Sequence, residues 1–295
     1  MSHKLYLVQN IMIFMEECLV ALPSGNDMYT INPNYVRSEI TFKNLQRDIS
    51  KLYPELEYIP YERITDDKWD TVYMSSYVPD EQLSFYDSLN AGEIILVEDG
   101  LFDYVSSEDK YDFYAEKELY LFRPSLASAL ANKAEIHPLE ISDKVIDKFT
   151  SIYKSELTAL SSIDPLTPVL FTTPLGEDFN ADCSITKEIL DYIQRVFAPE
   201  RIVLKRHPRD HFVYESDSLD IIECPQNIPG QLLDKIFEGH KLFLFPSTVS
   251  FMCGELSDIT FINVLPGNEQ YNNAFNGVIN SLVFNDQKCI KIMLM

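Results

Sequence analysis

The chain has 295 residues and a formal net charge of −22, because 46 Asp and Glu oppose 24 Lys and Arg. It is 46% hydrophobic and has only 9 Gly and 16 Pro, which excludes a disordered or collagen-like chain. The acidic balance also argues against a general nucleic-acid-binding protein, since phosphate contacts need clustered Lys and Arg side chains.

Short apolar runs alternate with helix-like stretches along nearly the whole chain. The pattern predicts strands at 4–8, 27–31, 57–60, 71–75, 93–97, 168–172, 201–205, 241–245 and 260–264, and amphipathic helices at 11–21 and 184–197. Such alternation is typical of βα units that form parallel sheets with helices on both faces, so we expect an α/β fold.

A stretch with a helical sequence pattern separates the chain into two halves. The stretch from 124 to 167 has a helical pattern and breaks at the two prolines of Ile163-Asp-Pro-Leu-Thr-Pro168. We therefore expect an N-terminal α/β domain at 1–123, a helical connection at 124–167 and a C-terminal α/β domain at 168–295. A ligand is expected at the carboxyl ends of the strands, in a cleft between the domains.

Neither a secretory signal nor a membrane-spanning helix is expected. The apolar run at 11–15 is followed directly by Glu16 and Glu17, and no stretch approaches the ~20 apolar residues that a bilayer requires. The five cysteines are scattered and form no CxxC pair, so neither a disulfide framework nor a zinc site is indicated. We expect a reduced, soluble, cytoplasmic protein.

The densest group of cations follows the predicted strand at 201–205. Lys205, Arg206, His207 and Arg209 lie within five residues, and Pro208 restricts the backbone beside His207. Phosphate or carboxylate binding is the natural use of such a group. The alternative is a charge cluster at a strand end that is paired with nearby acids.

The predicted strand at 93–97 delivers two adjacent carboxylates, Glu98 and Asp99, followed by Gly100. Because neighbours on an extended chain point to opposite faces, one carboxylate would orient or cap while the other reaches a substrate. A carboxylate placed in this way can act as a general base on a sugar hydroxyl. An ordinary strand-end turn is the alternative, because Asp and Gly are common in turns.

Three further segments could contact a ligand. Ser247 and Thr248 lie at the start of a predicted helix, where backbone N–H groups and hydroxyls can bind an anion, although simple N-capping explains this segment better when it is taken by itself. Thr172 and Thr173 follow the first strand of the second half, where a βα loop often touches a nucleotide. The segment 223–230 could present backbone groups to a base or serve only as a loop.

Several common functional motifs are absent from the sequence. The chain contains no GxGxxG, GxxxxGK[ST] or GxSxG, which argues against a dinucleotide oxidoreductase, a P-loop ATPase and a serine hydrolase. His137 lies in a second His-Pro pair, but no predicted strand or basic cluster accompanies it. We place it at a helix-to-loop junction without a functional role, and the histidines show no metal-ligand spacing.

In order and spacing, Glu98-Asp99-Gly100, His207-Pro208 and Ser247-Thr248 resemble the three short motifs of bacterial sialyltransferases. These are an acidic-acidic-Gly motif, a His-Pro motif and a paired Ser/Thr motif. The pattern is similar to that of the lipooligosaccharide and capsule sialyltransferases, glycosyltransferase family 52, with the bacterial polysialyltransferases as relatives. The resemblance spans about residues 93 to 255.

This resemblance implies a GT-B-like fold, in which two Rossmann-like domains face a central cleft and the second domain binds the donor, CMP-sialic acid. Asp99 would be the general base on the acceptor hydroxyl, and His207 would bind the leaving CMP phosphate with Ser247 and Thr248. The other expected substrate-binding residues are Glu98, Gly100, Thr172, Thr173, Lys205, Arg206 and Pro208.

The reaction would invert the anomeric centre without a metal or other cofactor, because a monophosphate leaving group can be stabilised by His⁺, hydroxyls and a helix dipole. The implied acceptor is a galactose-terminated bacterial surface glycan: lipooligosaccharide, O-antigen or capsule.

Two other functions stay open on the sequence. One is another sugar-nucleotide enzyme, either a UDP-sugar transferase or a UDP-sugar epimerase, and the other is a non-catalytic module that binds a glycan or nucleotide. The sequence also leaves open a homodimer, peripheral association with the inner face of the cytoplasmic membrane, and whether Lys205 or Arg206 faces the cleft.

Overall fold

The chain forms two compact units, Met1–Ile152 and Tyr153–Met295, in the computed structural model. The structure describes residues 3–36, 38–99, 111–127, 133–233, 235–245, 258–269, 271–273, 275–276, 279 and 291–295. Each unit contains one parallel β-sheet, so the predicted α/β fold with two parallel-sheet domains is confirmed.

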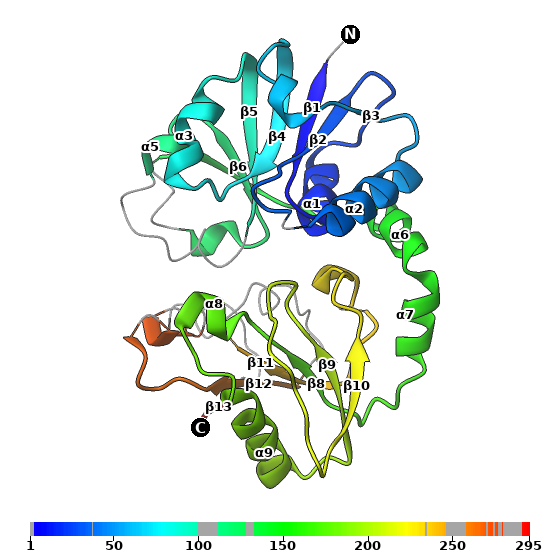
Figure 1. Ribbon diagram of the computed structural model, residues 1–295, viewed down its shortest axis with the longest axis vertical. Helices are drawn as coiled ribbons and strands as arrows, with labels where there is room; N and C mark the ends of the chain where they lie inside the picture. Colours follow the sequence, from blue (N-terminus) through cyan, green and yellow to red (C-terminus); the bar gives the residue numbers. More distant parts are fainter. Residues whose placement is uncertain are drawn as a thin grey trace. The chain divides into compact units, whose positions relative to one another are not determined.

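The first unit contains a seven-stranded sheet in the order β3-β2-β1-β4-β5-β6-β7, and all neighbouring strands run parallel (Figure 1). Its strands are β1 Lys4–Val8, β2 Met28–Ile31, β3 Glu57–Tyr58, β4 Trp69–Ser75, β5 Ala91–Val97, β6 Glu118–Leu121 and β7 Glu135–Pro138. Its helices are α1 Ile11–Val20, α2 Glu39–Leu52, α3 Asp80–Asp87, α5 Tyr111–Tyr114 and α6 Asp143–Ile152, with 3-10 turns at Tyr61–Arg63 and Pro124–Leu126.

The core of the first unit is built around the central strand β1. Residues Leu5 to Val8 are all fully buried, as expected for a parallel strand covered on both faces. Helix α1 begins directly after β1, because the Asn10 side chain accepts hydrogen bonds from the backbone N–H groups of Met12 and Ile13. It packs against β1, β4 and α6.

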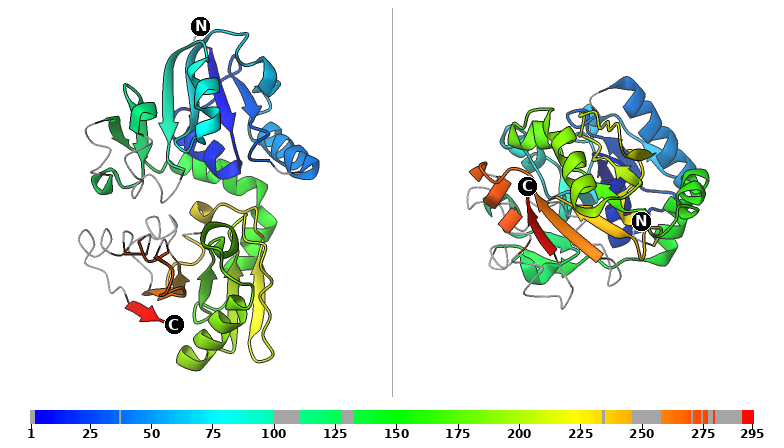
Figure 2. Two further views of the ribbon diagram at one scale, coloured as in Figure 1. Left: turned by 60° about the vertical axis from the view of Figure 1, so that its left-hand side comes forward. Right: turned by 90° about the horizontal axis from the view of Figure 1, so that it is seen from below.

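The second unit contains a six-stranded parallel sheet in the order β10-β9-β8-β11-β12-β13. Its strands are β8 Val169–Phe171, β9 Arg201–Lys205, β10 Asp220–Cys224, β11 Lys241–Leu244, β12 Asp258–Asn263 and β13 Lys291–Leu294. Its helices are α7 Lys154–Ser161, α8 Leu175–Phe179 and α9 Ile185–Phe197, with a 3-10 turn at Gly230–Leu232. Figure 2 shows the sheet of each unit from two further directions.

The two sheets share one doubly wound topology. In each, the chain builds three strands outward from the centre and then returns to build the other side, so the order reverses between β1 and β4 and between β8 and β11. In open α/β sheets, ligands bind outside the carboxyl ends of the strands at such a reversal. The residues that directly follow the strands are therefore the place to look for a site in each unit.

The structure corrects the expected helical connection at 124–167. That segment contains α6 and α7, but it also contains β7, which pairs with β6 at the edge of the first sheet. His137 lies in β7 and stacks on Tyr120, so its placement at a helix-to-loop junction is wrong. Half-exposed side chains give this short edge strand no apolar alternation. The division between the two units lies inside the same segment, between Ile152 and Tyr153.

Within the ranges described above, no helix combines the length and the apolar character that crossing a bilayer requires.

Candidate functional site

The strands β8 and β9 bring Thr172 beside the His-Pro loop of the second unit. The backbone N–H of Thr172 donates to the carbonyl oxygen of Lys205 at 3.0 Å, which continues the pairing of the two strands past the end of β8. The backbone N–H of His207 then donates to the Thr172 hydroxyl at 3.0 Å. A residue from the first βα loop thus fixes the start of the second loop.

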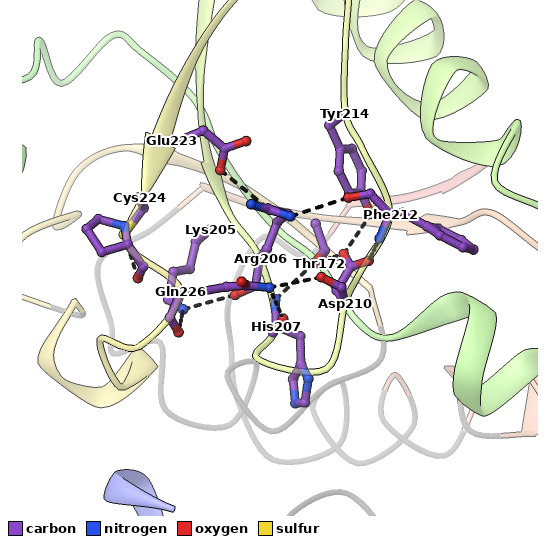
Figure 3. Close-up of polar contacts among 11 residues, drawn as sticks. Thr172, Lys205, Arg206, His207, Asp210, Phe212, Tyr214, Glu223, Cys224 and Gln226 are labelled. Carbon is purple, nitrogen blue, oxygen red and sulfur yellow. Dashed lines mark hydrogen bonds and ion pairs between the residues drawn. The ribbon is translucent and has the colours of Figure 1, made fainter. Parts of the chain in front are cut away.

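Asp210 lies at the centre of this arrangement and is only 2% exposed (Figure 3). Its carboxylate accepts hydrogen bonds from the hydroxyls of Thr172 and Tyr214 at one oxygen, and from the backbone N–H of Phe212 at the other. Burial, followed by the charge of Asp210, raises the pKa of Tyr214, which keeps its hydroxyl protonated as a donor. Asp210 thereby joins the loop after β8 to Phe212 and Tyr214 in the loop after β9.

The ring of His207 points away from this network in Figure 3, and the residue is partly exposed. Its Nδ1 accepts a hydrogen bond from the backbone N–H of Arg209 at 3.1 Å, so the proton of the neutral imidazole lies on Nε2. Loss of water contact, followed by the positive charges of Arg209 and Lys205, lowers the pKa of His207 to about 3. At neutral pH the site therefore presents an uncharged ring with an N–H donor.

Lys205 is buried and does not reach outward. It is 5% exposed, and its amine donates to the carbonyl oxygens of Arg206 and Gln226, each at 3.0 Å. Burial lowers the pKa of this amine to about 8. The Lys205 side chain fastens the loop after β10 to the loop after β9, so the geometry gives it a structural task.

Acidic side chains accompany both arginines of the cluster. Arg206 pairs with Glu223 at 3.4 Å, and Arg209 contacts both oxygens of Asp178 at 2.8 and 3.1 Å and lies 3.4 Å from Glu177. The alternative that the sequence left open, a strand-end cluster paired with nearby acids, therefore describes these two arginines. Among the described residues of this cluster, His207 has no acidic partner within ion-pair distance, and its ring points away from the Asp210 network (Figure 3).

In the first unit, Glu98 and Asp99 leave the end of β5 in different directions. Glu98 is 2% exposed, and its carboxylate accepts a hydrogen bond from the backbone N–H of Phe122 at 2.8 Å. This contact ties the end of β5 to the end of β6. Glu98 therefore supports the fold here, whereas Asp99 is partly exposed.

Two adjacent serines at the end of β4 hold Asp99. The hydroxyl of Ser75 donates to Asp99 Oδ1 at 2.8 Å, and the backbone N–H of Asp99 donates to Ser76 Oγ at 3.0 Å. Tyr35 lies close enough that the charge of Asp99 contributes, after burial, to the raised pKa of its phenol. The carboxylate is thus oriented at the carboxyl edge of the first sheet.

The other predicted site residues divide into three groups. Thr173 is buried, and its carbonyl oxygen accepts a hydrogen bond from the N–H of Leu175. Pro208 is exposed within the tight turn that joins His207 to Asp210. Gly100, Ser247 and Thr248 lie outside the described residues.

The sequence pattern missed the residues that support the two reactive groups: Ser75, Ser76, Asp210, Tyr214 and Gln226. A usable signal existed for Asp210, because it is the one acid in an otherwise basic run from Lys205 to Asp210. The segment 223–230 was expected to be a loop or to contact a base. Its first two residues belong to β10, and its Gln226 amide donates to the carbonyl oxygens of His207 and Asp210 at 2.8 and 2.9 Å.

Among the described side chains, no group of three or more His, Cys, Asp or Glu is arranged to hold a metal ion.

Sequence comparison finds no relative: no protein-family model matches the chain, and no curated protein matches it. Among solved structures, the chain is similar to an α/β-galactoside α-2,3-sialyltransferase from the luminous marine bacterium Photobacterium phosphoreum. The TM-score is 0.61 at 12% sequence identity, over 99% of this chain and 98% of that chain. A UDP-GlcNAc 2-epimerase from Methanocaldococcus jannaschii gives a TM-score of 0.46 at 12% identity, over 98% of this chain and 93% of that chain. The first similarity shows a GT-B-like fold.

Proposed function

We propose that the chain is a metal-independent, inverting glycosyltransferase that moves sialic acid from CMP-sialic acid to a galactose-terminated bacterial surface glycan. The observation that carries the proposal is the placement of two oriented reactive groups at carboxyl ends of strands: the Asp99 carboxylate after β5 and the His207 imidazole after β9. The three motifs of the sequence and the fold shared with a galactoside sialyltransferase support the choice of donor and acceptor class.

Asp99 takes the role of general base. Ser75 donates to its Oδ1 and so favours one orientation of the carboxylate. In the reaction, the carboxylate accepts the proton of the acceptor hydroxyl while that oxygen attacks the anomeric carbon of the donor. A positioned base of this kind contributes roughly 10²–10⁴-fold to the rate.

His207 takes the role of phosphate ligand. The bond between the anomeric carbon and the phosphate oxygen breaks, and its electron pair stays on the phosphate. The Nε2–H of His207 donates to that phosphate, and the negative charge of the phosphate favours protonation of the ring. An imidazole that is neutral before binding can therefore gain stabilising charge when the donor is bound.

Lys205 and Arg206 do not act as donor ligands in this mechanism, although the sequence suggested both. The amine of Lys205 is committed to two carbonyl oxygens, and Arg206 is paired with Glu223. Both residues hydrogen-bond carbonyl oxygens of the His207 loop: Lys205 that of Arg206, and Arg206 that of Phe212.

The direct test is transfer of sialic acid from CMP-sialic acid to lactose, followed by mass spectrometry. We expect Asp99→Ala and His207→Ala each to lower kcat by about 10²–10⁴-fold. Asp191→Asn, which changes an exposed carboxylate on α9, is the matched control and should transfer at the wild-type rate. Wild-type rates in both Asp99→Ala and His207→Ala would reject the proposal.

Nucleotide binding separates this proposal from the two alternatives. A nucleotide that binds the folded state stabilises it by about 2.7 kcal/mol at 100 times its Kd, so a thermal-shift panel of CMP, UDP and GDP identifies the preferred base. We expect CMP to give the largest shift. A preference for UDP would indicate a UDP-sugar enzyme, and CMP binding without turnover over a broad acceptor panel would indicate a non-catalytic module.

A further inference from the structure

Asp210 makes more hydrogen bonds than its place in an exposed turn requires. Three donors converge on its buried carboxylate: the Thr172 hydroxyl, the Tyr214 hydroxyl at 2.9 Å and the Phe212 backbone N–H at 3.1 Å. A carboxylate offers acceptors only, so it can satisfy all three donors at once. No part of the proposed reaction uses this group directly.

The hydroxyl of Thr172 transmits the orientation of Asp210 to His207. A hydroxyl has one proton, and in Thr172 that proton is directed at Asp210. A lone pair of the same oxygen then faces the backbone N–H of His207, which donates to it at 3.0 Å. Asp210 thus determines the direction from which the Thr172 hydroxyl oxygen can accept a hydrogen bond.

The rest of the loop is closed around the same two residues. The N–H of Asp210 donates to the carbonyl oxygen of His207 at 2.9 Å, and the Gln226 amide bridges the carbonyl oxygens of both. With its backbone held on both sides, His207 accepts the Arg209 N–H at Nδ1, which leaves the proton on Nε2, and its ring points away from the network (Figure 3).

We infer that Asp210 is a positioning residue, which acts through Thr172 to hold the His207 ring in the orientation and tautomer that present Nε2–H to an anionic ligand. This inference deepens the proposed function and rests on it for the identity of the ligand. The orientation and the tautomer themselves can be measured without any ligand.

An Asn at position 210 cannot reproduce the network, although it has the same shape. If its NH₂ group replaces the oxygen near Thr172 and Tyr214, it donates to Thr172 and competes with the N–H of His207. If the NH₂ group takes the other place, it opposes the N–H of Phe212. Either arrangement loses a hydrogen bond.

The first experiment measures the tautomer by nitrogen NMR of the full chain with ¹⁵N-labelled histidine, the signals of His207 being assigned by their loss in His207→Gln. We expect a single Nε2–H form near pH 7 in the wild type and a mixture of both tautomers in Asp210→Asn and Thr172→Val. Thr172→Ser keeps the hydroxyl and should keep the single form, as should Asp191→Asn. Unchanged His207 signals in both Asp210→Asn and Thr172→Val would overturn the inference.

The second experiment measures transfer from CMP-sialic acid to lactose. We expect Asp210→Asn and Thr172→Val to lower kcat by about 10²-fold with little change in the KM for the donor, because a misplaced group loses stabilisation in the transition state. The kcat of Thr172→Ser should stay close to that of the wild type. An equal loss of kcat in Thr172→Ser and Thr172→Val would overturn the role of the hydroxyl. If the wild type transfers no sialic acid, the proposed function fails, and the nitrogen spectra alone decide the positioning.

Discussion

Glu17 in the first unit and Asp210 in the second unit are both buried acids, but they differ in their hydrogen bonding. Glu17, in α1 of the first unit, is fully buried, and within the described part of the chain neither of its carboxyl oxygens has a hydrogen-bond partner. Asp210, in the second unit, is 2% exposed and accepts three hydrogen bonds. Burial raises the pKa of Glu17 well above its usual range, so we expect a neutral carboxylic acid there.

The comparison shows that burial alone does not assign a role to an acid. A buried acid without partners costs free energy, because its charged form is unsolvated and its neutral form needs a proton that the unfolded chain does not hold at pH 7. A buried acid with a full set of donors instead fixes the groups around it. The second arrangement occurs beside the candidate site, and the first lies in a helix that packs on the sheet.

The largest effect on stability is expected for Asp210→Asn. The substitution places one donor against another in a buried network, so the free energy of unfolding should fall by about 2–3 kcal/mol. Urea unfolding followed by circular dichroism measures this change. The exposed Asp191→Asn is the control and should stay within about 0.5 kcal/mol of the wild type. An equal effect of the two substitutions would show that the hydrogen bonds of Asp210 add no stability.

Glu17→Gln should act in the opposite direction. The amide keeps the shape of the acid but needs no proton uptake on folding, so the free energy of unfolding at pH 7 should rise. The same urea titration measures it. A loss of stability at pH 7 would show that the carboxyl of Glu17 has a favourable role in the core.

The pH dependence of the stability difference between Glu17→Gln and the wild type tests the direction of the Glu17 pKa shift. Since the folded-state pKa of Glu17 is raised, the stability associated with its proton is complete below the unfolded pKa and is lost as pH rises toward the folded pKa. The gain from Glu17→Gln should therefore be small near pH 4 and grow as pH rises. A constant difference between the two proteins over this range would contradict a raised pKa.

Sequence patterns predict the parts of this fold that are apolar and continuous. The runs at β1, β9 and β11 are buried after their first residue, and β5 is buried in its carboxyl half. Each was expected within one or two residues of its bounds. The strands β6, β7, β10 and β13 were not expected. In β7 and β10, partly exposed side chains give no clear period, and only pairing with a neighbour makes the segment a strand.

The same limit applies to the candidate site. Asp99 and His207 follow predicted strands, so their position at a carboxyl edge could be inferred from the sequence. Their supporting partners lie far away along the chain: Ser75 is 24 residues from Asp99, and Asp210 is 38 residues from Thr172. Those pairs form because β4 is beside β5 and β8 is beside β9, and strand order is not encoded in a hydrophobic period.

Ser75→Ala extends the comparison to the partly exposed carboxylate of Asp99. One side-chain hydrogen bond from Ser75 orients Asp99, so its loss should lower kcat for sialyl transfer by about 10-fold, equivalent to about 1.4 kcal/mol. Ser84→Ala, on the exposed side of α3, is the control and should leave kcat unchanged. A loss as large as that of Asp99→Ala would mean that Ser75 is itself part of the chemistry.

The smallest effect is expected for Glu223→Gln, which removes the acid paired with Arg206. At 3.4 Å and with Glu223 51% exposed, water and salt screen the pair, so unfolding free energy should change by about 0–1 kcal/mol. Asp220→Asn, at the opposite end of the same two strands, removes the similarly exposed Arg201 pair and should behave alike. If Glu223→Gln alone lowered the free energy of unfolding by more than about 2 kcal/mol, Arg206 would belong to the hydrogen-bond network of Asp210. An exposed ion pair does not contribute that much, whereas an acid that orients a buried group does. The exposed Glu223 would then stabilise the loop as the buried Asp210 does. Hydrogen-bond partners, and not burial, would then identify the residues that support His207.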